Sequence, residues 1–329
     1  MQARGTTRTR ITSALFLLAA CLPIPSAPSH AAYPDRVIKI VVPFSPGGGT
    51  DVVARTLAQE MAKELGASVI IENKPGAGTI LGTQLVAASP PDGYTLLMGT
   101  FANAVNPSLN PKLPYDAHKD FAAVALLARS FNIVVVNPAS PHKSIADLIA
   151  AAKAAPGKLS YGTYGTGTSA HLAGELFRHM AGVDLTTVPY RGAAPAITDL
   201  MGGQIDVIFT TVASAASLVE AGQLRAIAVT SAERSPAFPL LPTVSEAGVP
   251  GYAAEAWYGL YAPTKTPPEI ITKLNAEVVK ILNLPDVRER LLASGSEPVG
   301  NTPEQMAAQI AKETAEFAGI VKRAKLVVE

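Results

Sequence analysis

The sequence predicts an α/β fold, and two observations lead to this prediction. Short apolar strands alternate with amphipathic helices, beginning with a strand at 37–42, a helix at 52–65 and a strand at 69–72. Two glycine-rich loops, at 43–51 and 162–169, each follow a strand and lead into a helix. Alternation of this kind is typical of a mostly parallel sheet with helices on both faces.

The remaining elements can be assigned in order. The irregular stretch 107–119 is rich in Pro, Asn and Asp and interrupts the pattern. Strands are predicted at 94–98, 124–127, 133–136, 207–209, 226–229 and 256–261, and a further strand ends at 190. Helices are predicted at 79–88, 145–154, 172–180, 268–282 and 303–322, and a further helix begins near 195. We expect the chain to enter a second domain near 128–131 and to return with the strand at 256–261.

Residues 1–32 are typical of a signal peptide. Basic residues precede the apolar run 11–22, which is too short to span a bilayer as a stable anchor. Small residues offer cleavage after Ala31 or Ala32. Lipid attachment at Cys21 is the alternative, because the residues before it resemble a lipoprotein box; we favour simple cleavage.

Charge and cysteine content exclude several classes of protein. The chain of 329 residues has 27 Lys and Arg against 26 Asp and Glu, and residues 1–32 hold three arginines and no acids, which leaves 24 against 26. This balance is not the basic footprint of a nucleic-acid-binding protein. Cys21 is the single cysteine, so the exported chain has no internal disulfide, thiol catalyst or cysteine-based zinc site.

The two glycine-rich loops indicate an anion site, because bare main-chain N–H groups at a helix N-terminus attract negative charge. The first loop is not a nucleotide P-loop, since Thr50 and Asp51 follow its glycines where Lys and Ser or Thr are needed. Taken alone, it could be a structural turn with Asp51 in the first turn of a helix. Two such loops on an exported protein favour capture of a small carboxylate between two domains.

The second loop leaves an alternative function open. Residues 165–170 fit the pattern G-x-G-x-x-A after a strand, which is typical of dinucleotide-binding proteins. The alternative is therefore an exported NAD(P)-dependent dehydrogenase that uses Gly165–Ala170. Asp184 has the spacing of a ribose-binding acid, but it precedes the strand whose end such an acid should occupy.

Signatures of catalysis and metal binding are weak. His171, Glu175 and His179 have i, i+4, i+8 spacing, but the two histidines drift apart around a helix by about 80°. Neither an HExxH motif nor a G-x-S-x-G nucleophile elbow occurs in the sequence. We therefore predict no catalytic residue, no metal and no cofactor, which is the profile of a binding protein rather than an enzyme.

A series of motifs extends over nearly all of residues 33–329. The motifs are, in order, Tyr33-Pro34, PFSPGGGTD at 43–51, ENKPGAG at 72–78, PDGYTL at 91–96, GTSAHLAGE at 167–175, VPYRG at 188–192, GGQID at 202–206, WYG at 257–259 and PTKTP at 263–267. In this order they resemble the Bug family, the solute-binding receptors of tripartite tricarboxylate transporters.

The resemblance implies a periplasmic binding-protein fold of two α/β lobes with a hinge and an interlobe cleft. Lobe 1 would comprise 33–128 and 253–329, and lobe 2 would comprise 129–252. The ligand carboxylate would be held by loops of both lobes, largely through main-chain groups and ordered water. The ligand-binding residues carried over are Phe44, Gly47, Gly48, Thr50, Asp51, Thr100 and Asn103 in lobe 1, and Tyr164, Gly165, Thr168, Ser169, His171, Tyr190, Arg191, Gly192 and Thr211 in lobe 2.

The implied function is that of a periplasmic receptor that captures a small organic carboxylate and delivers it to membrane permease subunits. The ligand stays open among dicarboxylates, tricarboxylates, acidic amino acids and aromatic carboxylates. Arg191, where lysine is also familiar in the family, favours two carboxylates, because a guanidinium can grip one of them bidentately. We expect a monomer. A sensory receptor that signals to a membrane kinase would share this site.

Replacing Gly48 or Gly167 with leucine is expected to weaken ligand binding sharply while the protein stays folded. The reason is that both glycines allow close approach of the main chain to the ligand. Titration of each variant, with circular dichroism as the check on folding, tests this; unchanged affinity in a folded variant would remove that glycine from the site.

Overall fold

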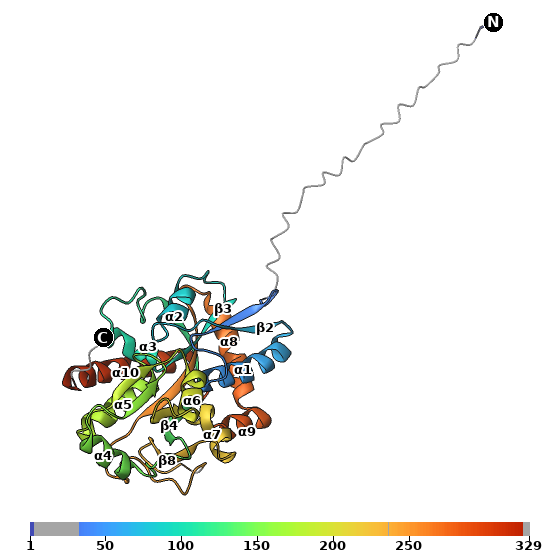
Figure 1. The fold of residues 1–329 in the computed structure, drawn as a ribbon. Coiled ribbons are helices and arrows are strands. Elements are labelled where there is room, and N and C mark those ends of the chain that lie inside the picture. The colour runs from blue at the N-terminus through green and yellow to red at the C-terminus, as the bar shows by residue number, and fades with distance from the viewer. Residues whose placement is uncertain (3–32, 236, 325–329) are drawn as a thin grey trace. The chain divides into compact units, whose positions relative to one another are not determined.

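The computed structural model describes residues 1–2, 33–235 and 237–324 (Figure 1). Tyr33–Glu329 form one compact unit, and every contact discussed below lies within it. Residues 3–32 of the predicted signal peptide, with Cys21 and the cleavage sites, fall outside the described residues.

One curled sheet organises this unit. Its strands follow the order β2-β1-β3-β9-β4-β7-β5-β6, and β8 and β10 also pair with β4. The strands are β1 (Ile38–Val42), β2 (Val69–Asn73), β3 (Thr95–Thr100), β4 (Phe121–Val136), β5 (Ser160–Thr163), β6 (Thr186–Pro189), β7 (Val207–Thr211), β8 (Arg225–Val229), β9 (Glu255–Pro263) and β10 (Ser296–Pro298).

As far as β8, the helices alternate with these strands, as the α/β prediction requires. They are α1 (Gly49–Leu65), α2 (Ile80–Ala87), α3 (Ala102–Leu109), α4 (Ile145–Ala154), α5 (Ser169–Ala181), α6 (Ala193–Met201), α7 (Val212–Glu220), α8 (Pro268–Leu282), α9 (Pro285–Ala293) and α10 (Pro303–Ala324).

Strand β4 corrects the prediction of two separate strands at 124–127 and 133–136. It is continuous from 121 to 136; residues up to Phe131 pair with β9, and those from Asn132 onward pair with β7. The sequence predicted a break here because residues 128–131 were interpreted as the crossing into a second domain. The polar residues Arg129 and Ser130 both have partners in the folded chain: Ser130 Oγ donates to the carbonyl of Gly295, just before β10 (3.0 Å), and Arg129 lies 3.4 Å from a carboxylate oxygen of Glu255 in β9.

The sheet is also less parallel than predicted. The pairs β1–β2, β1–β3, β5–β6 and β5–β7 are parallel, whereas every pairing made by β4 or β9 is antiparallel. The two long strands run antiparallel to each other through the middle of the sheet. They therefore join a parallel group on one side (β1, β2, β3) to a parallel group on the other (β5, β6, β7).

Three helices and one short strand were not predicted, namely α3, α7, α9 and β10. Helix α3 contains Pro107, which made the sequence look irregular because proline removes a helical hydrogen bond. Helix α7 has neither a side-chain cap nor an acid in its first turn. Helix α9 follows α8 after only two residues, with Pro285 at its first position, where proline is tolerated.

Helix α3 is held in place by the C-terminal helix. The Phe101 ring at its start meets Phe317 of α10 edge to face, with ring centroids 4.4 Å apart. Trp257 of β9 donates its indole N–H to Glu313 of α10 (2.6 Å). In Figure 1, α10 (dark red) lies beside α3. These contacts fix a helix that borders the cavity described below.

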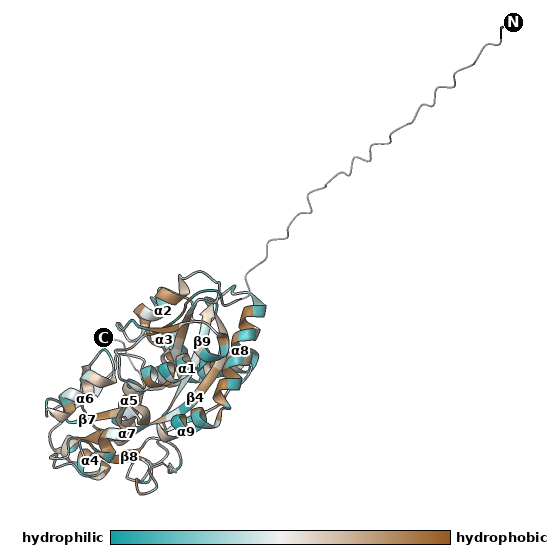
Figure 2. Cartoon of the chain, turned by 90° about the vertical axis from the view of Figure 1, so that its right-hand side faces the viewer, coloured by the Kyte–Doolittle hydropathy of each residue, from teal (hydrophilic) through white to brown (hydrophobic). Residues whose placement is uncertain are grey.

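The core is apolar on both sides of the sheet. Buried side chains of β1, α1 and α8 form one cluster, and those of β5, β7 and α5 form another, in which the Phe177 and Phe209 rings lie 5.4 Å apart. Helices α8 and α9 show both hydrophobic and hydrophilic colours in Figure 2, as expected for helices that cover a core. Over the described ranges, every helix is too short or too polar to cross a membrane.

Candidate functional site

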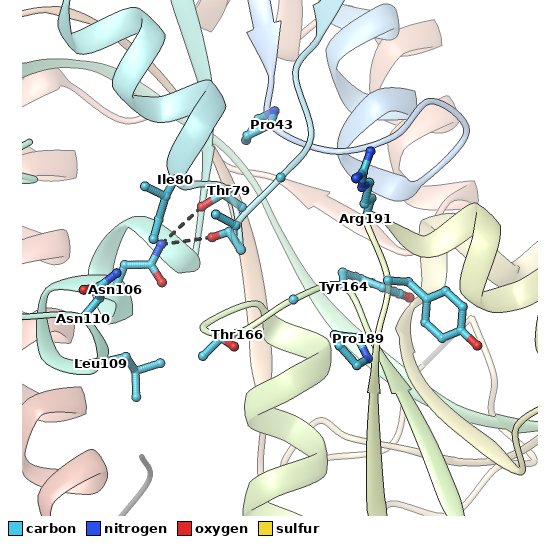
Figure 3. Close-up of a pocket in the computed structure, with 15 residues that line it drawn as sticks. Pro43, Thr79, Ile80, Asn106, Leu109, Asn110, Tyr164, Thr166, Pro189 and Arg191 are labelled. Carbon is cyan, nitrogen blue, oxygen red and sulfur yellow. Dashed lines mark hydrogen bonds between the residues drawn. The ribbon is translucent and has the colours of Figure 1, made fainter. Parts of the chain in front are cut away.

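A cavity of about 390 Å³ opens between loops that come from the two parallel groups of strands (Figure 3). From the side of β1, β2 and β3 come Pro43, the loop before α2, and α3. From the side of β5, β6 and β7 come the loops before α5 and α6. The lining residues are Pro43, Gly76, Ala77, Gly78, Thr79, Ile80, Asn106, Leu109, Asn110, Tyr164, Gly165, Thr166, Pro189, Tyr190 and Arg191.

The electrostatics of this cavity favour an anion. Arg191 is the one charged residue among the described residues that line it. Three of the lining loops lead directly into helices α2, α5 and α6, whose N-termini carry partial positive charge. The rest of the wall combines amides and hydroxyls with apolar groups such as Ile80 and Leu109, which suits a short carbon chain with charged ends.

The loop before α2 has an unusual backbone. Gly76, Ala77, Gly78 and Thr79 have φ values of 138°, 48°, 57° and 81°. Ala77 and Thr79 are therefore strained, since residues with a Cβ rarely adopt positive φ. Asn106 of α3, only 3% exposed, holds the loop: its Nδ2 donates to Gly78 O (3.2 Å) and to Thr79 Oγ1 (3.3 Å), as Figure 3 shows. Strain of this kind concentrates at ligand-binding sites.

Four of the predicted ligand-binding residues line the cavity: Tyr164, Gly165, Tyr190 and Arg191. Two of them are fixed by their own contacts. The Tyr164 hydroxyl donates to Thr210, and burial raises the pKa of Tyr164. The Tyr190 hydroxyl donates to Asp199 (2.7 Å), and burial together with this carboxylate raises the pKa of Tyr190 to about 12. The Arg191 side chain is exposed at the cavity wall.

The first glycine-rich loop meets the opposite side through its main chain. Ser45 N donates to Arg191 O (3.1 Å), and Gly49 N donates to Ser214 Oγ (2.8 Å). A Cβ on Gly48 would lie 3.3 Å from Ala193 Cβ at the start of α6. The predicted residues Gly47, Gly48 and Gly192 therefore lie where the two groups of loops meet.

Asp51 has a role within its own loop. Its carboxylate, 5% exposed, accepts hydrogen bonds from Gly47 N (3.0 Å), Arg55 (2.8 Å) and Asn73 Nδ2 (2.9 Å). Burial alone would raise the pKa of Asp51, but these hydrogen bonds lower it below its ordinary value. The carboxylate is thus engaged in shaping the loop around the N-terminus of α1.

The second glycine-rich loop is fixed by the first turn of α5. Thr168 Oγ1 donates to Gly165 O (2.7 Å), and Ser169 O accepts from Asn132 of β4 (3.2 Å). His171, 9% exposed, accepts a hydrogen bond from Gly167 N at Nδ1 (3.3 Å), so Nδ1 carries no proton. Burial lowers the pKa of His171, Glu175 acts in the opposite direction, and Arg178 adds to the lowering.

The other predicted site residues are buried near these loops. Phe44 belongs to the core, and Thr50 lies in the first turn of α1. Asn103 Oδ1 accepts from Thr100 N (2.9 Å) in the turn before α3. Thr211, the last residue of β7, directly precedes α7, and its hydroxyl is hydrogen-bonded to the Ser214 hydroxyl (2.8 Å). None of these side chains is among the described residues that line the cavity.

The sequence did not single out several lining residues. Residues 76–78 fall within a recognised motif but were not assigned to the site, and Thr79 and Ile80 follow that motif directly. Asn106, Leu109 and Asn110 were not predicted, because Pro107 made helix α3 difficult to recognise in the sequence. Ser214 carried no sequence signal, since its contact with Gly49 depends on how two distant loops meet.

The structure also shows how the candidate metal-binding and ribose-binding residues lie. Within 33–235 and 237–324, no three His, Cys, Asp or Glu side chains group in a way that could hold a metal ion. Asp184, the candidate ribose-binding acid, is engaged by Arg178 in an ion pair of 2.9 Å.

Comparison with known proteins places the chain among transport receptors. The family described as "Tripartite tricarboxylate transporter family receptor" matches residues 53–326. Protein BugT of Bordetella pertussis is 37% identical over 316 residues, which cover 95% of this chain and 97% of the relative.

Two solved structures give the same result for the fold. An R. palustris protein solved with adipate superposes with a TM-score of 0.87 at 38% identity, covering 90% of this chain and 99% of that chain. MatC from Rhodopseudomonas palustris, with bound malate, superposes with a TM-score of 0.84 at 35% identity, covering 88% of this chain and 100% of that chain. The predicted periplasmic binding-protein fold is therefore confirmed.

The lowered pKa of His171 predicts that the stability of the folded chain depends on pH. As pH falls below the ordinary histidine value of about 6.5, the unfolded chain takes up the proton before the folded chain does, so stability is lost. His171→Asn keeps an acceptor for Gly167 N without a titrating ring. The melting temperature of the wild type should fall more between pH 7.5 and 5 than that of His171→Asn; parallel decreases would contradict the assignment.

Proposed function

The chain belongs to the tripartite tricarboxylate transporter receptor family, and we propose that it binds a small dicarboxylate in the cavity between its two groups of loops. The family is one of solute-binding receptors rather than enzymes. The alternative of an exported dehydrogenase that uses Gly165–Ala170 receives no support from it.

The observation that carries the proposal is the distribution of charge around the cavity. Loops that lead into the N-termini of α2, α5 and α6 line it from both sides, and Arg191 adds a full positive charge at one wall. Two anionic groups can therefore be held, one by main-chain N–H groups and the other by the guanidinium. A ligand with a single carboxylate would leave one of these positions unused.

The ligands of relatives agree with this chemistry. Adipate and malate, named for two of the solved structures, each carry two carboxylates on a short carbon chain. A cavity of about 390 Å³ is within the range of small-molecule sites, and its apolar wall suits such a chain. We propose the same class for this protein, with dicarboxylates ahead of tricarboxylates, acidic amino acids and aromatic carboxylates.

We also propose that the two groups of loops belong to two lobes that close on the ligand. The lobes are 33–128 with 253–329, and 129–252. The change of partner along β4, between Phe131 and Asn132, lies close to the first of these boundaries and supports it. Only a ligand with higher affinity for the closed form can shift the lobes toward closure.

The proposal extends to location and partners. The family is one of transporter receptors, and a similar solved structure is that of the periplasmic binding protein BugD. We therefore propose export to the periplasm, monomeric binding of the solute, and delivery to the permease subunits of the transporter. A receptor that signals to a membrane kinase would use the same cavity and would differ only in its partner.

The variant Arg191→Gln tests whether Arg191 holds the second carboxylate of the ligand. In the wild type, adipate should bind more tightly than monomethyl adipate, which has the same chain and one carboxylate. In Arg191→Gln, binding of adipate should weaken by roughly tenfold or more, the effect of losing a charge-assisted bidentate contact. Binding of the monoester should change by less than about threefold. Isothermal titration calorimetry gives both dissociation constants.

Arg288→Gln is the matched control, because Arg288 is exposed and does not line this cavity. It should leave both affinities unchanged. An equal loss for adipate and monoester in Arg191→Gln, or no loss for either, would show that Arg191 does not hold the second carboxylate.

A further inference from the structure

We propose that Gly78 is a specificity-determining residue: its main chain meets that of Thr166 and seals one wall of the cavity, which restricts the site to compact carboxylates. The inference rests on the proposed function of this cavity. It concerns the size of the ligand, which the charge of the site leaves open.

The contact at this wall is between two backbones. A Cβ atom on Gly78 would overlap the carbonyl oxygen of Thr166. A Cβ on Gly165 would lie 2.9 Å from Gly78 Cα, closer than real Cβ contacts come. Gly78, Gly165 and Thr166 all line the cavity, so the place where they touch forms part of its wall.

Both loops at this contact are held in place by other contacts. Gly78 lies in the run of four residues with positive φ, and Asn106 holds its carbonyl and the Thr79 hydroxyl. On the other side, Gly167 follows Thr166 and donates its N–H to His171 in the first turn of α5. Asn106 also spans the contact, because a Cβ on Gly167 would overlap its Oδ1.

This geometry limits what the closed site accepts. With Gly78 against Thr166, no ligand atom can pass between the two loops at that point, so the ligand must end inside the cavity. A side chain at position 78 would hold the loops apart, and any ligand enclosed there would stay partly hydrated. Short ligands, which need full closure for their contacts, should lose more affinity than long ones, which can extend into the gap.

Gly78→Ala tests the inference, and two other glycines provide matched controls. Gly66 and Gly182 have φ values of 62° and 61°, close to the 57° of Gly78, and nothing lies within 4 Å of a Cβ built on either. Gly66→Ala and Gly182→Ala therefore introduce the same backbone strain without the clash. Both glycines end helices away from the cavity.

The measurement is calorimetric titration of the full chain and of each variant with succinate, glutarate, adipate and suberate. In Gly78→Ala, the affinity for the shortest diacid that the wild type binds should fall at least tenfold, and the preference should shift toward suberate. Gly66→Ala and Gly182→Ala should keep the wild-type order, with each affinity within twofold. The melting temperature of ligand-free Gly78→Ala should match those of the controls, because the inference assigns this contact to the closed form of the site.

Other outcomes would overturn the inference. Affinities of Gly78→Ala equal to those of the controls would mean that the contact does not limit the ligand. A lower melting temperature than the controls, or failure to fold, would mean that the contact is permanent and structural rather than part of closure. If the wild type binds no carboxylate of the panel, the proposed function itself fails, which is a separate result from either of these.

Discussion

Close main-chain approach between two groups of loops is the constraint on which the site depends. At Ser45 and Arg191 the approach is a hydrogen bond of 3.1 Å, and at Gly78 and Thr166 it is direct van der Waals contact. A side chain at position 78 would keep the loops apart, so glycine is required there, where the contact is tightest. The helix N-termini behind the loops can face a ligand from both sides only because the loops come this close.

The rest of the structure supports these loops. The Asp51 carboxylate accepts hydrogen bonds from Gly47, Arg55 and Asn73 and so fixes the first loop. Asn106 donates to Gly78 O and so holds the strained loop before α2. Helix α3, which carries Asn106, is packed against α10 through Phe101 and Phe317. A continuous β4 links the two sides of the sheet, so movement of one group of loops relative to the other must bend that strand and its partner β9.

Much of the fold could be predicted from the sequence, because periodic apolar residues decide most of its elements. Helices α8 and α10 and the α/β alternation are of this kind. Strand β4 was divided wrongly because Arg129 pairs with carboxylates of β9 and α10, and Ser130 bonds to Gly295 just before β10; a local sequence pattern cannot reveal these contacts. Helix α3 was missed because of Pro107. Within the candidate site, Tyr190 and Arg191 could be named from a motif and Tyr164 and Gly165 from the second glycine-rich loop. Asn106 could not, because its role depends on contacts between segments far apart in the chain.

The central claim is that the protein is a receptor for a small carboxylate, and a thermal-shift screen against carboxylates and NAD(H) tests it most directly. A ligand that binds only the folded state stabilises it by about 2.7 kcal/mol at a hundredfold excess over its dissociation constant. We expect the melting temperature to rise with one or more short dicarboxylates and to stay unchanged with NAD(H). A rise with NAD(H) and none with any carboxylate would contradict the receptor assignment.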